Sequence, residues 1–208
     1  YNEQKSIVNV VKNIKNSCPN VDYVIINDCS KDNTKKIIEE NKLNYISLPV
    51  NMGIGGGVQT GYKYAVENNY DIAIQMDGDG QHDPSYIDKI IKPIVDGEAD
   101  MVIGSRFIEK EGFQTSFMRR VGINFLKGLI KVCCKKTITD ATSGFRAVNK
   151  KLAKEFSQNY AQDYPEPEAI THSIVRGYKV KEVPVIMHER QEGESSINKI
   201  RSIYYMIK

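Results

Sequence analysis

The fold of this chain is decided by Asp71-Ile72-Ala73-Ile74-Gln75-Met76-Asp77-Gly78-Asp79-Gly80-Gln81-His82-Asp83-Pro84. This stretch begins as a mostly apolar run, which is typical of a buried parallel strand. Acids and glycines follow at its carboxyl end, the edge at which open α/β sheets bind their ligands. The sequence therefore predicts an α/β protein with a polar site at this edge.

Two carboxylates in this stretch are separated by a single glycine. A tight turn at Gly78 can aim Asp77 and Asp79 at one point, and Gln81 adds an amide oxygen two residues further on. Such oxygens suit a hard cation, Mg²⁺ or Mn²⁺, and Mg²⁺ commonly also binds substrate phosphates. A solvated polar turn is the alternative, because Asp and Gly are ordinary turn residues. The apolar strand in front favours the metal site.

The composition fits one compact α/β domain. The chain has 208 residues, and the 40% that are hydrophobic are enough for a core. A net charge of +3 indicates no general nucleic-acid-binding surface, and no apolar run reaches the ~18 residues of a membrane span. The four cysteines have neither disulfide nor zinc spacing, so we expect reduced thiols in the cytoplasm.

Strands and helices alternate through the first half of the chain. This order predicts a mostly parallel, twisted sheet that is flanked by helices through right-handed crossovers. Asp83 and Pro84 are expected to be the N-cap and first residue of a helix. The expected helices cover residues 5–16, 58–66 and 87–95, and the expected strands cover 23–27, 43–50, 71–76 and 100–104.

Polar and glycine-rich turns follow the first two strands. Asp28 stands at a strand end, where its carboxylate can accept hydrogen bonds from a nucleobase or ribose. For Ser30 and Asp32, a helix cap is an equally good explanation. Residues 51–57 lead into a helix and could bind phosphate, but they match no standard phosphate-loop pattern. Close packing of glycines such as Gly55 is the alternative.

The second half is less regular. Residues 116–135 predict a long helix with an apolar side and a basic stripe of Arg120, Lys127 and Lys131. Such a helix could lie peripherally on an anionic membrane surface, although a solvated face is the commoner explanation. The remaining expected elements are a polar turn at 139–146, a helix after the acidic segment 163–168, a strand at 180–187 at a sheet edge, and a final amphipathic helix near residue 200.

Seven motifs occur in a specific order. They are Tyr1-Asn2-Glu3, Asp28-x-Ser30-x-Asp32-x-Thr34, Asn51-x-Gly53, Asp77-Gly78-Asp79-x-Gln81-His82, Gly104-Ser105-Arg106-Phe107, Asp140-x-x-Ser143-Gly144-Phe145-Arg146 and Arg190-x-x-Gly193-x-Ser195-Ser196. Together they resemble the family 2 glycosyltransferases, and the last three are similar to the branch that contains dolichol-phosphate mannose synthase. The resemblance covers essentially the whole chain.

This resemblance implies a GT-A fold, a UDP- or GDP-sugar donor and inversion at the anomeric carbon. It implies one domain over residues 1–208, with a nucleotide-sugar-binding half at 1–105 and an acceptor-side half at 106–208. By motif position, it assigns Tyr1, Glu3 and Asp28 to the nucleoside, Asp77 to ribose and metal, Asp79 and Gln81 to the metal, and Arg106, Arg119 or Arg120, and Arg190 to phosphates. Gly55, from the glycine-rich turn, is a further candidate for donor binding.

Two departures from the family pattern concern the acceptor. Residues 163–168 lack the Glu-Asp pair of many relatives that glycosylate hydroxyl groups. The C-terminal transmembrane helices of some lipid-directed relatives are also not in this sequence. Either the acceptor is not a lipid, or the protein meets the membrane through its surface or a partner.

We therefore expect an inverting, metal-dependent transferase that acts on a polyprenyl phosphate, in the cytoplasm or at the inner face of the membrane. Asp79, Asp140, Arg106 and Arg146 are the expected catalytic residues, because a cation and arginines stabilise a leaving diphosphate. A sugar hydroxyl in polysaccharide synthesis is the second choice of acceptor, and it would need Asp140, Glu166 or Glu168 as base. A sugar-phosphate nucleotidyltransferase and a non-catalytic nucleotide-sugar-binding module are the other hypotheses.

Overall fold

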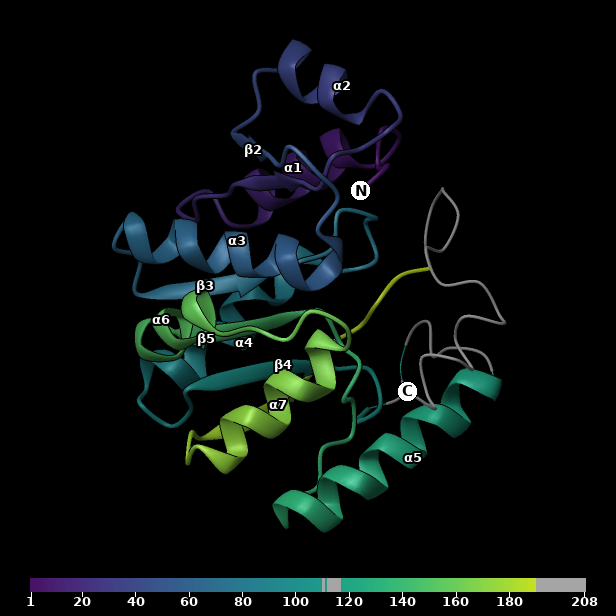
Figure 1. The fold of residues 1–208 in the computed structure, drawn as a ribbon, viewed down its shortest axis with the longest axis vertical. Helices are drawn as coiled ribbons and strands as arrows, with labels where there is room; N and C mark the ends of the chain where they lie inside the picture. The colour runs from purple at the N-terminus through teal and green to yellow at the C-terminus, as the bar shows by residue number, and fades with distance from the viewer. Residues whose placement is uncertain (110, 112–116, 190–208) are drawn as a thin grey trace.

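The structure is a computed structural model that describes residues 1–109, 111 and 117–189; for residues 117–119 and 121 it describes the backbone alone. Its strands are β1 (Ile25–Asn27), β2 (Tyr45–Ser47), β3 (Ile72–Gln75), β4 (Met101–Ser105), β5 (Arg146–Asn149) and β6 (Val180–Pro184). They form two hydrogen-bonded sheets, the pair β1-β2 and a four-stranded sheet in the order β3-β5-β4-β6 (Figure 1).

The helices agree with the sequence pattern wherever that pattern is periodic. Asp83 is the expected N-cap, and its carboxylate accepts a hydrogen bond from the backbone N–H of Ser85 at 2.9 Å. One helix, α6, is not in the sequence prediction, and the final helix near residue 200 lies outside the described residues. The helices are α1 (Ile7–Ser17), α2 (Thr34–Glu40), α3 (Gly53–Glu67), the single-turn η1 (Pro84–Tyr86), α4 (Ile87–Val95), α5 (Phe117–Cys134), α6 (Lys150–Gln158) and α7 (Pro165–Val175).

Strand β4 is buried on both faces, which explains its continuous apolar sequence. Met101 and Ile103 face a core that contains residues of α3, α6 and α7. Val102 points to the opposite face and packs in a second core with residues of α4. Because successive side chains of a strand point to opposite faces, these cores hold the four-stranded sheet between two helical layers.

The expected α/β architecture is confirmed, but the sheet is more mixed than the alternating pattern predicted. β5 runs antiparallel to both of its neighbours, whereas β4 pairs with β6 in parallel. The apolar pattern did not reveal this reversal, because Ala147 and Val148 are buried whichever way the strand runs. Pro184 ends β6 at the sheet edge, as expected, and all four cysteines are free.

The glycine-rich segment is helical rather than a loop, since α3 already begins at Gly53. Gly53 has a φ of +74°, a left-handed conformation that favours glycine. Gly55 is pressed against another part of the chain, because a Cβ at this position would lie 2.3 Å from the carbonyl oxygen of Ala161. The structure thus gives Gly55 a packing role.

Candidate active site

The acid turn follows β3 and is held in place by His82. The backbone N–H of Asp77 donates to Nδ1 of His82 at 3.0 Å. Nδ1 must be unprotonated to accept this bond, so in the neutral ring Nε2 carries the proton, 3.7 Å from Oδ2 of Asp77. The buried imidazole stacks on Phe145, with ring centroids 5.0 Å apart. His82 therefore positions the turn from beneath, a role that the motif alone did not assign.

The oxygens of the turn face different surroundings. Asp79 is buried, and its Oδ1 accepts a hydrogen bond from the backbone of Gln81 at 3.0 Å. The side chain of Gln81 donates from Nε2 to the carbonyl of His188 at 3.4 Å, which leaves its amide oxygen outside that bond. Asp77 is more exposed, and a Cβ on Gly144 would lie 3.0 Å from its Oδ1. Glycine at 144 thus keeps the space beside the Asp77 carboxylate open.

The N-terminal segment lies beside this turn. Oγ of Ser6 lies 2.7 Å from the carbonyl oxygen of Gly78 and 2.9 Å from Oε2 of Glu3. This bridge connects the start of the chain to the acid turn 72 positions later. Glu3 and Asp77 consequently approach the same space from two different segments.

The Asp-x-Ser-x-Asp-x-Thr motif fastens this N-terminal segment. The backbone N–H groups of residues 2, 3 and 4 donate to Ser30, Thr34 and Asp32, at 3.0, 2.9 and 3.3 Å. Burial acts to raise the pKa of Asp32, but hydrogen bonds from Thr34 and Gln4 outweigh it and lower that pKa. Ser30 and Asp32 thus hold protein backbone, and Asp32 also caps the entry to α2 through the N–H of Thr34.

Asp28 lies between β1 and the start of α3. Its Oδ1 accepts from the backbone N–H of Met52 at 2.6 Å, and its Oδ2 from that of Gly53 at 2.9 Å. These N–H groups begin a helix and have no partner within it. The buried carboxylate therefore fixes the segment 51–53 against the end of β1.

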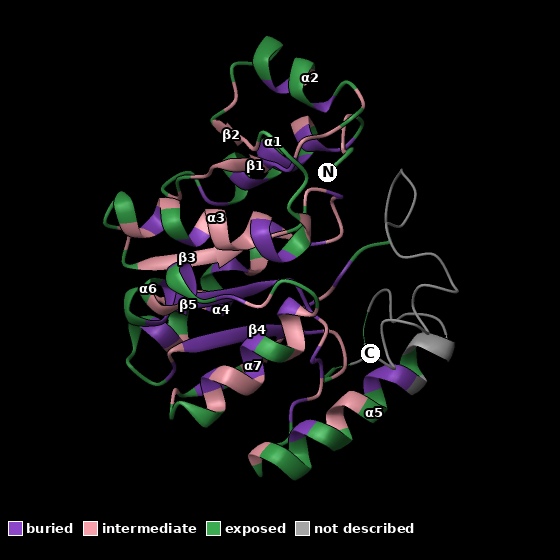
Figure 2. Cartoon of the chain, viewed as in Figure 1, coloured by how far each residue is buried: buried purple, intermediate pink, exposed green. Residues whose placement is uncertain are grey.

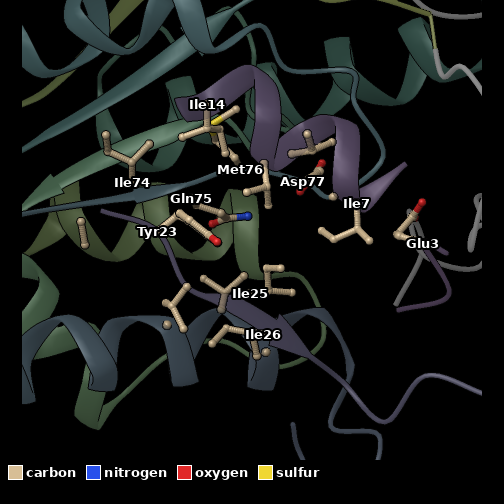
Figure 3. Close-up of a pocket in the computed structure, with 18 of the residues that line it drawn as sticks. Glu3, Ile7, Ile14, Tyr23, Ile25, Ile26, Ile74, Gln75, Met76 and Asp77 are labelled. Atoms are coloured by element: carbon tan, nitrogen blue, oxygen red, sulfur yellow. The ribbon is translucent and has the colours of Figure 1, made fainter. Parts of the chain in front are cut away.

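These groups line one cavity of about 820 Å³, which lies between β1 and β3. Figure 3 shows Glu3 and Asp77 at one end, and the apolar side chains of Ile25, Ile26 and Ile74 further in. The cavity has a polar mouth and an apolar interior. The predicted nucleoside and metal residues on its wall are Tyr1, Glu3, Asp28, Asp77, Asp79 and Gln81.

Other predicted site residues are not on that wall. Gly55 packs on Ala161, as described above, and Arg106, Asp140 and Arg146 are also absent from the lining. Arg190 and the side chain of Arg119 lie outside the described residues, and Arg120 is exposed on α5.

Arg106 and Asp140 form a two-pronged ion pair. Nε of Arg106 donates to Oδ2 at 2.7 Å and Nη2 to Oδ1 at 2.8 Å, with the carboxylate 0% exposed. Nη2 also donates to Thr142 at 3.1 Å. Both oxygens of Asp140 are thus engaged by a permanent cation, a poor arrangement for a base. The geometry gives Asp140 the role of orienting Arg106.

Glu182 supports this pair from β6. Its carboxylate accepts from the backbone N–H groups of Thr139 and Asp140, both at 2.8 Å, and from Oγ1 of Thr139 at 2.7 Å. The sequence analysis missed Glu182. Its only signal was an acid within an apolar strand, and acids on edge strands are ordinary.

Arg146 lies beneath the site, with 0% exposure. It donates to the carbonyl oxygens of Ser143 and Glu166, and so ties the polar turn to the first residues of α7. Glu166 lines the cavity, and burial raises the pKa of its carboxyl group while Arg146 opposes that rise. Arg146 therefore acts as a buried support.

The acid turn fits a metal ion that arrives with its substrate. No group of three or more His, Cys, Asp or Glu residues gathers as a metal site within the described part of the chain. Two carboxylates and one amide oxygen are an incomplete set for a cation held by protein alone. They match Mg²⁺ sites that are completed by substrate phosphates and water.

Comparison with known proteins identifies the family. A model of glycosyl transferase family 2 matches residues 1–157. The chain belongs to this family and is a glycosyltransferase. It is 35% identical over 209 residues to UDP-N-acetylglucosamine–dolichyl-phosphate N-acetylglucosaminyltransferase from Methanococcus voltae, covering 89% of this chain and 81% of the relative. It is 25% identical to polyprenol monophosphomannose synthase from Mycolicibacterium smegmatis, with 95% and 78% covered. The resemblance to this branch is confirmed.

Solved structures confirm the GT-A fold. Glucosyl-3-phosphoglycerate synthase from Mycobacterium tuberculosis in complex with UDP has a TM-score of 0.71 at 18% identity, with 99% of this chain and 76% of that one covered. The same synthase with Mn²⁺, UDP-glucose and phosphoglyceric acid has a TM-score of 0.69, with 92% and 69% covered. At this identity the likeness concerns the fold alone.

Proposed function

We propose that this enzyme transfers a sugar from a nucleotide-diphosphate sugar to a polyprenyl phosphate, with inversion and with Mg²⁺ or Mn²⁺. The observation that carries the proposal is the convergence of Glu3, Asp28, Asp77 and Asp79 on one cavity. Relatives named for transfer to dolichyl or polyprenol phosphates support the acceptor. The donor then belongs to residues 1–105 and the acceptor to residues 106–208.

The donor would enter the cavity between β1 and β3. Tyr1, Glu3 and Asp28 would hold the nucleoside, while Asp77, Asp79 and Gln81 would hold the cation against the diphosphate. A bound cation neutralises the charge that develops on the leaving diphosphate. His82 and Ser6 keep the acid turn in place while the charge moves, so little reorganisation is needed.

The acceptor-side residues support a phosphate nucleophile. A phosphate monoester has a second pKa of about 6 and is largely ionised at neutral pH, so it attacks unaided. Asp140 would orient Arg106, whose planar guanidinium matches phosphate oxygens. A polyprenyl phosphate lies in a bilayer, and the enzyme must therefore meet a membrane surface.

A sugar hydroxyl is the second candidate acceptor, and one observation favours it. Glu166 lines the same cavity as Asp77, and burial raises its pKa towards the range that suits a general base. Asp140, which the sequence analysis preferred as base, has both oxygens engaged by Arg106. Glu166 is accordingly the base to test.

The two acceptors can be separated by one assay. Purified enzyme is given UDP- and GDP-sugars, Mg²⁺ or Mn²⁺, and either short polyprenyl phosphates or free oligosaccharides. We expect a lipid-linked sugar from the first acceptor, and Glu166→Gln should leave that transfer measurable. Transfer to oligosaccharide alone, abolished by Glu166→Gln, would replace the proposal with the second candidate.

A further inference from the structure

Helix α5 carries an apolar stripe that the described residues leave exposed. Phe125, Leu129 and Val132 are 57%, 45% and 78% exposed, and their spacing places them on one face of the helix. Ile123 and Ile130 on the other side are buried, where α5 packs against α7. Figure 2 shows α5 along the side of the molecule, with exposed residues along its length. Large exposed side chains elsewhere, such as Val95 and Val175, stand singly.

The charges of α5 all have one sign. Its charged residues are Arg119, Arg120, Lys127 and Lys131, and no acid occurs between Phe117 and Cys134. At about 100° per residue, Lys131 falls next to the apolar stripe, and Arg120 and Lys127 continue the same side. Long basic side chains can extend from such a position to a charged surface beside the stripe.

We propose that α5 docks this enzyme on an anionic lipid bilayer, with Phe125, Leu129 and Val132 inserted below the headgroups. A helix with an apolar face, a basic flank and no acid is the pattern of an interfacial helix. A single-sign flank complements anionic headgroups, whereas protein interfaces tend to exclude charge from the buried core. This inference rests on the proposed lipid acceptor for its purpose, although binding to vesicles is measured without any transfer.

The position of α5 suits this role. It packs against α7, and the first turn of α7 carries Glu166, which lines the donor cavity. A bilayer that meets α5 would therefore lie one helix away from the cavity. No helix within the described residues is both long and apolar enough to cross a membrane.

The test is flotation of the whole chain with vesicles. We expect binding to vesicles of phosphatidylglycerol and phosphatidylcholine in equal parts, weakened by salt, and little binding to phosphatidylcholine alone. Phe125→Ser/Leu129→Ser/Val132→Ser should weaken binding about tenfold or more. Lys127→Gln/Lys131→Gln should weaken it about thirtyfold at low salt. The matched control, Val95→Ser/Val175→Ser, removes exposed valines from α4 and α7 and should bind like the wild type.

The outcomes separate this inference from the proposed function. Equal binding by the wild type and the stripe variant, or no binding by either, overturns docking through α5. Concentration-dependent self-association that the stripe variant abolishes, without vesicle binding, assigns the stripe to a second copy and also overturns it. Thermal melts and transfer to a short, water-soluble polyprenyl phosphate should match the wild type in the stripe variant. Vesicle binding without transfer to any polyprenyl phosphate would leave docking standing and refute the acceptor.

Discussion

At the scale of single residues, the site is a set of side chains that hold one another. His82 and Ser6 hold the acid turn, the Asp-x-Ser-x-Asp-x-Thr motif holds the N-terminal segment, and Asp28 holds the start of α3. Each is polar, and each satisfies backbone groups that would otherwise lack a partner. Residues that face the cavity can therefore be varied separately from residues that support them.

Asp79→Asn should reduce transfer at least about a hundredfold, because a lost carboxylate removes both a metal ligand and charge stabilisation. The folded state should change little, since asparagine keeps an oxygen that can accept the N–H of Gln81. Turnover at saturating donor and a thermal melt without ligands measure the two effects. Asp71→Asn, at the exposed start of the same segment, is the matched control. Near-normal turnover of the Asp79 variant would refute the metal assignment.

Glu182→Gln should lower kcat about tenfold or more through Arg106, because an amide cannot accept from both backbone N–H groups that the carboxylate holds. The KM for the donor should stay close to the wild-type value, since Glu182 does not line the donor cavity. Glu98→Gln removes an exposed acid that pairs with the adjacent Lys181, and it should have no effect. A loss of stability with unchanged kcat would make Glu182 purely structural.

At the scale of elements, α3 and α6 are joined by close packing, and α6 and α7 by charge. α3 lies against α6 and against the segment 161–162 that follows it. Glu155 on α6 accepts hydrogen bonds from Tyr178 and Arg176 and contacts His172. Both junctions lie behind the site and set where α7 begins.

Gly55→Ala should destabilise the fold by about 2 kcal/mol or more, because its Cβ would overlap the backbone at residues 161–162. Gly57→Ala is the matched control in the same helix. A Cβ at 57 would meet nothing within 4 Å, so alanine should stabilise α3 by about 0.5–1 kcal/mol. Chemical denaturation measures both. Equal effects of the two substitutions would contradict the packing role of Gly55.

Acid should weaken the junction between α6 and α7. The hydrogen bond from Tyr178, aided by His172 and Arg176, lowers the pKa of Glu155 to about 2. The folded-state pKa is below the unfolded one, so this stabilisation is complete above about pH 5 and is lost as the pH falls towards 2. Glu155→Gln should be less stable at pH 7, by about 1–2 kcal/mol after solvent screening. The gap from the wild type should close on acidification, and a gap independent of pH would contradict this account.

At the scale of the whole molecule, the two sheets meet at the donor cavity. A ligand that binds there contacts α1, β1, α3 and β3 together and should stabilise them as a unit. A nucleoside diphosphate at about a hundred times its Kd should add about 2.7 kcal/mol, provided that a divalent cation is present. Thermal melts with UDP or GDP, with and without Mg²⁺ or Mn²⁺, measure this gain. A shift that chelation does not reduce would show that the cation does not take part in binding.

The sequence by itself determined the features that depend on neighbours along the chain. Apolar spacing located the periodic helices and strands, Asp83-Pro84 located a helix start, and the acids after β3 located the site edge. Each is a local signal, because burial, capping and turn formation are decided within a few residues. The family followed from the order of these same local motifs.

Only the tertiary structure decided the features that depend on distant partners. Arg106 and Asp140 are 34 positions apart, and Glu182 reaches Thr139 across 43. From the sequence, Asp140 was a free carboxylate and a candidate base; in the fold, a guanidinium occupies both of its oxygens. The direction of β5 and the contact of Gly55 with Ala161 were hidden for the same reason. A residue type states which bonds a side chain can make, whereas the fold decides which partner arrives to make them.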